Sequence, residues 1–113
     1  MLQLLTDEQQ FDSLIQSWWE FIIFKHSTRC SISNRGCAEV YNTIDSLKLD
    51  NIFLIDVLNQ KQLATYIANQ SNIHHESPQI IFFDKGKAYA NGSHGQVNER
   101  NIRHILGWGW AGK

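Results

Sequence analysis

The sequence contains only two cysteines, a single proline and no long hydrophobic run among its 113 residues. No apolar segment approaches the roughly 20 residues that a membrane-spanning helix requires. The N-terminus lacks the basic region of a signal peptide and turns acidic at Asp7 and Glu8. The formal net charge of −1 gives no electrostatic reason to bind nucleic acid or an anionic membrane. We therefore expect one domain, residues 1–113, that binds neither of them.

The apolar content, 42% of the residues, is sufficient for an ordinary packed core. Apolar residues at helical spacing or in short continuous runs mark eight elements. The expected helices are 7–18, 30–47, 60–69 and 99–106, the expected strands are 20–26, 51–57, 79–84 and 87–91, and a loop is expected at 91–95. Thr6 and Asn98 are suitable caps for the first and last helices. Strands joined through a helix pair in parallel, whereas the turn Asp84-Lys85-Gly86-Lys87 favours a hairpin. This order predicts an α/β fold with a mixed four-stranded sheet, helices on both faces and an additional N-terminal helix.

The two cysteines, Cys30 and Cys37, fall in one expected helix. At ~1.5 Å of rise per residue their Cα atoms would be about 10 Å apart. A disulfide needs a Cα separation below about 7 Å. We therefore expect two free thiols, as in a reducing compartment such as the cytoplasm. We interpret Cys37 as a structural residue, with a slow resolving role as the alternative.

Cys30 follows an apolar strand and a polar turn, at the point where a helix begins. The first N–H groups of that helix and its dipole favour a negative charge there, which is a general way to produce a reactive thiolate. Arg29 adds a positive charge, and His26 would help if it lies close. The Ser33 hydroxyl could donate to the sulfur. The plain alternative is that Cys30 is a small buried apolar residue.

Pro78, the only proline, opens an expected strand, which is a position where a residue without an N–H is tolerated. If its peptide bond is cis, it makes a rigid corner. The main chain of Ser77 could then pair with an extended partner, opposite Cys30. The plain alternative is a simple turn from loop to strand.

Three segments together resemble the monothiol bacilliredoxin (YtxJ-like) family of the thioredoxin-like superfamily. They are His-Ser-Thr-Arg-Cys-Ser-Ile-Ser at 26–33, His-Glu-Ser-Pro-Gln at 75–79 and Ser-His at 93–94. The resemblance covers nearly the whole chain. Ser31 departs from the family pattern, which usually has proline after the cysteine, and its N–H adds a donor near the sulfur.

The resemblance implies a thioredoxin-like fold, a cis bond at Pro78 and thiol exchange with bacillithiol mixed disulfides. Cys30 would be the nucleophile, and Thr28, Arg29, Ser31, Ser33 and His26 would support its thiolate. Ser77, Pro78 and His94 would form the substrate-binding edge. Ser33 stands where a dithiol redoxin has its second cysteine, so the adduct on Cys30 would wait for an outside thiol. Bacillithiol would be a co-substrate, with no bound cofactor, and the partners would be S-thiolated client proteins.

Two other function classes stay open. The chain could be a non-catalytic thioredoxin-like binding module, or it could carry an iron–sulfur cluster, as some monothiol glutaredoxins do. A metal site built from His74, His75, His94 and Cys30 is disfavoured, because adjacent histidines usually point apart and no tetrahedral ligand spacing is present. Glutathione is an alternative to bacillithiol, and the residues do not determine the oligomeric state.

Overall fold

The computed structural model describes residues 2–17 and 19–107, so position 18, the last of the expected first helix, lies outside the described residues. Along the chain the elements are β1 (Leu2–Leu4), α1 (Glu8–Ser17), β2 (Phe21–His26), α2 (Ser31–Leu47), β3 (Ile52–Asp56), α3 (Lys61–Ser71), β4 (Gln79–Asp84), β5 (Lys87–Ser93), a 3₁₀ turn η1 (His94–Gln96) and α4 (Glu99–Leu106). All eight elements expected from the sequence are present, with small shifts at their ends.

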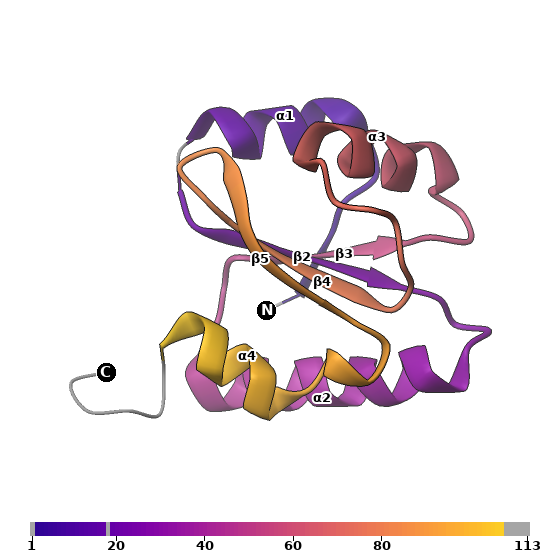
Figure 1. Cartoon of the computed structure of the whole chain (residues 1–113), viewed down its shortest axis with the longest axis vertical. Helices are drawn as coiled ribbons and strands as arrows, with labels where there is room; N and C mark the ends of the chain where they lie inside the picture. The colour runs from indigo at the N-terminus through magenta and orange to yellow at the C-terminus, as the bar shows by residue number, and fades with distance from the viewer. Residues whose placement is uncertain (1, 18, 108–113) are drawn as a thin grey trace.

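The sheet has five strands rather than the four predicted, in the order β1-β3-β2-β4-β5. β1 and β2 pair in parallel with β3, whereas β4 is antiparallel to both β2 and β5. The sequence prediction missed β1 because a strand of three residues carries no periodic signal; pairing with the edge of β3 defines it. Helices α1 and α3 cover one face of the sheet, and α2 and α4 cover the other (Figure 1).

The central strand β2 is buried at all six of its positions. Phe21 and Ile23 enter a core cluster on the α1/α3 face, while Ile22 and Phe24 enter a second cluster on the α2/α4 face. A strand that is covered on both faces and paired on both edges has little freedom to shift. The end of β2 is therefore a fixed platform for the turn that follows it.

Local sequence explains most of the element ends. The turn between β4 and β5 has positive φ at Lys85 (54°) and Gly86 (78°), as expected for the predicted hairpin. Asn98 caps α4, and its side chain accepts from the N–H of Asn101. The N-cap of α1 is Asp7 rather than Thr6, because the Asp7 carboxylate accepts from the backbone of the third helical residue.

One further feature of the sequence prediction needs correction. The expected loop at 91–95 is wrong, because β5 continues to Ser93 and the 3₁₀ turn follows directly. Gly36 lies buried within α2. A Cβ at Gly36 would come within 3.2 Å of the Val97 side chain, so glycine allows α2 to pack closely against the segment before α4. Within the described residues, no helix is both long and apolar enough to cross a membrane.

The aromatic cluster beneath α1 gives the first testable prediction. Phe11 is fully buried and makes edge contacts with Phe21, Tyr66 and Phe83 at ring-centroid distances of 5.6–6.3 Å. Phe11→Ala should lower the free energy of unfolding by about 3–5 kcal/mol, because it leaves a cavity in a core that cannot fully collapse. Urea unfolding measures this loss. Leu4→Ala, at a side chain that is 59% exposed, is the control, and a similar loss in both variants would contradict this packing.

Candidate active site at the start of α2

Cys30 lies directly before the first turn of α2, as the N-cap residue. It has extended backbone angles, φ −107° and ψ 123°, and its carbonyl accepts the first helical hydrogen bond from the N–H of Asn34 at 3.0 Å. The N–H groups of residues 31–33 have no helical carbonyl four residues earlier in the chain to which they could donate. The thiol is partly exposed and free. Its position therefore combines solvent access with the positive end of a helix dipole.

The first turn of α2 is bonded to the end of β2 through Ser33. The Ser33 hydroxyl is fully buried; it accepts from the N–H of Ser27 at 2.9 Å and lies 2.7 Å from His26 Nδ1. These contacts hold the turn that carries Cys30 against the central strand. Among the described residues, no hydrogen bond joins Ser33 to the sulfur of Cys30. The supporting role expected of Ser33 stays a prediction, and its observed role is to fix the turn.

His26 points away from solvent, toward the α2 side of the sheet. It stacks on Phe24 with ring centroids 5.5 Å apart. Burial lowers the pKa of His26, while the Asp56 carboxylate and the backbone of Ser33 oppose this shift. The imidazole is therefore neutral at pH 7 and supplies no full positive charge to a thiolate. The geometry gives His26 a structural contact with Ser33 rather than an ionic one with Cys30.

The other residues expected to support the thiolate lie on the exposed side of the turn. Thr28, Arg29 and Ser31 are all exposed. The Thr28 carbonyl accepts from the side chain of Asn34 at 3.3 Å, which closes the turn over the start of the helix. Arg29 is the cation nearest to Cys30 in sequence, and the roles of all three stay predictions.

Cys37 is half-buried and packs against the apolar cluster on the α2/α4 face. Burial raises the pKa of the Cys37 thiol, so it remains protonated at neutral pH. A protonated thiol within a helix is a poor nucleophile. This environment agrees with the structural interpretation of Cys37.

Pro78 lies at the same end of the sheet as Cys30. It precedes Gln79, the first residue of β4, which pairs with Lys25 near the end of β2. The Ser77–Pro78 peptide bond is cis. The Ser77 hydroxyl is shielded from solvent and has no hydrogen-bond partner among the described residues. The loop before Pro78 and the turn before α2 therefore flank the end of the central strand.

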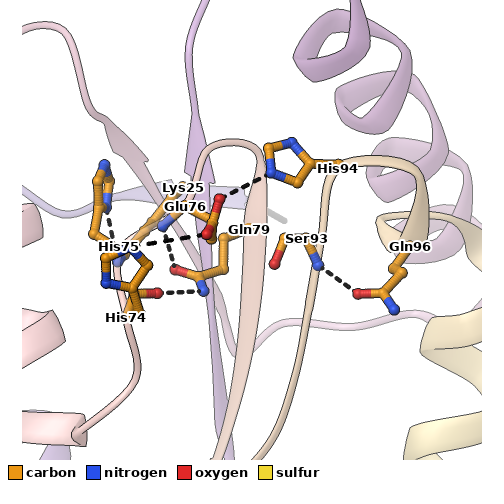
Figure 2. A network of polar contacts seen from close by, with 8 residues as sticks. All are labelled: Lys25, His74, His75, Glu76, Gln79, Ser93, His94 and Gln96. Atoms are coloured by element: carbon orange, nitrogen blue, oxygen red, sulfur yellow. Dashed lines mark hydrogen bonds and ion pairs between the residues drawn. The ribbon is translucent and has the colours of Figure 1, made fainter.

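Sequence reasoning missed Lys25, which the structure places beside this loop. Its side chain is fully buried, and its Nζ lies 3.1 Å from Nδ1 of His75 (Figure 2). Burial lowers the pKa of Lys25 from its ordinary value of 10.5 to about 8, although the Glu76 carboxylate opposes the shift. One signal was available, because a lysine within an otherwise apolar central strand cannot avoid burial.

Figure 2 shows how the loop before Pro78 is held by residues from three elements. Gln79 on β4 donates to the His74 carbonyl at 3.0 Å and accepts from the N–H of Glu76 at 3.4 Å. The side chain of His94, in the 3₁₀ turn after β5, contacts the Glu76 carboxylate at 2.9 Å, and its backbone N–H donates to the Pro78 carbonyl at 2.8 Å. The hydrogen bond with His94 lowers the pKa of Glu76. His94 thus contacts this loop, and its role in substrate binding stays a prediction.

The histidines of this region do not form a metal cluster with Cys30 in the described structure. Among residues 2–17 and 19–107, no group of three or more histidine, cysteine, aspartate or glutamate side chains is arranged to hold a metal ion. His94 and His74 instead lie 2.9 and 3.9 Å from the Glu76 carboxylate.

This sheet, with a cysteine opening the helix after its central strand and a proline before the next strand, defines a thioredoxin-like protein. The family model described as "Monothiol bacilliredoxin BrxC" matches residues 3–102, and the chain belongs to that family. The resemblance inferred from the three sequence segments is thus confirmed. Family and fold together support a thiol oxidoreductase role.

Solved structures agree on the fold. A protein described as having a thioredoxin fold shares 27% identity, with a TM-score of 0.87 and 93% coverage of both chains. Thioredoxin from Fasciola hepatica shares 15% identity, with a TM-score of 0.73, over 93% of this chain and 96% of its own. Mitochondrial thioredoxin 3 from Saccharomyces cerevisiae shares 14% identity, with a TM-score of 0.74, over 94% and 93%.

The buried ammonium of Lys25 predicts how stability depends on pH. Between about pH 8 and 10.5 the unfolded chain keeps a proton that the folded protein has released, so the free energy of unfolding should rise across this interval. Lys25→Met should lack this rise and be more stable at pH 7 by about 1–4 kcal/mol, since an apolar side chain replaces a desolvated charge.

Urea unfolding between pH 7 and 10.5 measures both effects. Lys61→Met makes the same chemical change at an exposed position at the start of α3 and should follow the wild type. Parallel pH curves for Lys25→Met and the wild type would show that Lys25 is not desolvated.

Proposed function

We propose that the protein removes bacillithiol, or a related small thiol, from mixed disulfides on protein cysteines, with Cys30 as the nucleophile. The observation that carries the proposal is the placement of a partly exposed, free Cys30 at the N-terminus of α2. The helix dipole and the neighbouring Arg29 favour the thiolate, which is the attacking species in thiol–disulfide exchange. The reducing cytoplasm is the compartment in which such a free thiol persists.

The exchange proceeds in two balanced steps. In the first, the Cys30 thiolate attacks the small-thiol sulfur of the mixed disulfide, a new disulfide forms, and the client cysteine leaves as a thiolate that takes a proton from water. In the second, an outside small thiol attacks the sulfur of the adduct. This step releases Cys30 as a thiolate and gives a disulfide of two small thiols. The protein therefore ends reduced, as it began.

Ser33 explains why an outside thiol is needed. It occupies the third position after Cys30, on the first turn of α2, and its hydroxyl is engaged with Ser27 and His26. An alcohol oxygen cannot displace a thiolate from a disulfide. The other thiol, Cys37, is half-buried in an apolar cluster and protonated at neutral pH. The small-thiol adduct on Cys30 is therefore stable until a second small thiol arrives.

The main chain at Ser77 is the edge that holds the client. A chain that pairs along it approaches the end of β2, next to the turn that carries Cys30.

Intact mass spectrometry tests the proposal directly. With a peptide that carries bacillithiol on its cysteine, the wild type should gain the mass of one bacillithiol and release the free peptide. The adduct should persist until more bacillithiol is added. Cys30→Ser should gain nothing, and Cys37→Ala should behave as the wild type. Rapid loss of the adduct with formation of an internal Cys30–Cys37 disulfide would contradict the mechanism, and a glutathione peptide tests the choice of small thiol.

Ser33→Cys should convert the one-thiol reaction into a two-thiol reaction. The new thiol would lie one helical turn from Cys30 and would attack the adduct, which releases the small thiol and leaves a disulfide between Cys30 and the introduced sulfur. The mass of the variant after the challenge should be lower than that of its reduced form by two hydrogen atoms. Ser33→Ala, which loses the same hydrogen bonds without adding a thiol, is the matched control. A persistent adduct on Ser33→Cys would show that position 33 does not face the sulfur.

A further inference from the structure

Thiol exchange at Cys30 does not by itself require the lysine at position 25. Burying an ammonium group costs stability unless a partner holds the charge. The residues in register with Lys25 on the neighbouring strands are Ile55 and Gln79, and neither carries a charge. The α1/α3 face of the sheet around them is an apolar cluster. The partners of the ammonium therefore come from the loop before Pro78.

The contact between Lys25 and His75 has a defined direction. An ammonium group can only donate, so Nδ1 of His75 accepts across the 3.1 Å and the ring proton lies on Nε2 (Figure 2). Partial desolvation of the ring and the nearby ammonium lower the pKa of His75, which keeps the ring neutral and able to accept at pH 7. The Glu76 carboxylate favours the charged form of Lys25. The contact geometry and the charges thus both favour a charged Lys25 that donates to a neutral His75.

We propose that Lys25 is a positioning residue that holds His75 and thereby fixes the main chain at Ser77, two residues further on, for docking of the client chain. This inference rests on the proposed function of Cys30. It goes beyond that function because it makes the buried charge of Lys25 responsible for the orientation in which the client chain docks. Gln79 and His94 hold the same loop from β4 and from the turn after β5. Lys25 supplies the tether from β2, the strand that also leads to Cys30.

The tether depends on the protonation of the groups that face it. These are His75, Glu76 and His74 on the loop, and His94 beyond Glu76. As the pH falls into the acidic range and His75 takes a second proton, the ring can no longer accept and it repels the ammonium. Above about pH 8 the charge on Lys25 is lost. The loop is therefore held most firmly across the neutral range.

Two reactions of Cys30 separate positioning from intrinsic reactivity. Iodoacetamide alkylates the thiolate and needs no docking edge, whereas a peptide that carries bacillithiol needs the edge at Ser77. Lys25→Met should slow exchange with the peptide about tenfold, since a small misplacement of a bound partner is costly, and should leave the alkylation rate unchanged. His75→Ala, at an exposed residue, should give the same loss, and the double variant no further loss. Lys61→Met is the control and should match the wild type.

Both reactions require the Cys30 thiolate. Dividing the thiol-exchange rate by the alkylation rate therefore removes the pH dependence that comes from the thiol itself. In the wild type this ratio should fall at acidic pH as His75 takes a second proton, and in Lys25→Met it should be flat there. An unchanged exchange rate in Lys25→Met, or a parallel fall in alkylation, overturns the positioning role. If the wild type itself shows no exchange, the proposed function fails, and the amide measurement below still tests the tether.

Hydrogen exchange provides that second measurement. The N–H of Glu76 is bonded to Gln79, and the N–H of His94 to the Pro78 carbonyl, so both report on the loop. In Lys25→Met these two amides should exchange at least several-fold faster, although the variant as a whole is expected to be more stable. If both amides exchange at the wild-type rate in Lys25→Met, Lys25 does not hold the loop, whatever the activity of the variant.

Discussion

The central strand β2 is the constraint on which the site depends. It is paired on both edges and buried on both faces, so its last residues cannot move without disturbing both cores. His26, at its end, contacts the Ser33 hydroxyl in the first turn of α2. The position of Cys30 is thus set by a strand that is buried on both faces. A nucleophile held in this way loses little freedom when a partner binds.

On the opposite side of the site, polar contacts hold the main chain in place. The loop before Pro78 has no helix or strand of its own, and side chains from β2, β4 and the turn after β5 hold it (Figure 2). These include the buried Lys25 and a Glu76–His94 contact whose side chains are partly exposed. The protein therefore combines a fixed thiol with a loop whose position depends on charge. A buried lysine that lowers stability is typical of a residue retained for function rather than for folding.

Much of this arrangement could be predicted from the sequence, because hydrophobic periodicity and turn chemistry are local signals. Adjacent residues in the sequence were sufficient to predict Cys30 at the start of a helix, the hairpin at Gly86 and the Asn98 cap. The fifth strand did not, since Leu2–Leu4 becomes a strand only by pairing with β3. Lys25 was passed over for a similar reason. Its partner, His75, is 50 residues away, and no local pattern joins the two.

The central claim is that Cys30 exchanges thiols with a chain bound along the edge at Ser77. A crystal structure of the Cys30→Ser, Cys37→Ala variant, bound to a peptide whose cysteine carries bacillithiol, tests it most directly. We expect a peptide in extended conformation, hydrogen-bonded to the main chain of Ser77, with the small-thiol sulfur facing position 30. A bound peptide that leads away from Pro78, with the Ser77 main chain unpaired, would contradict the claim.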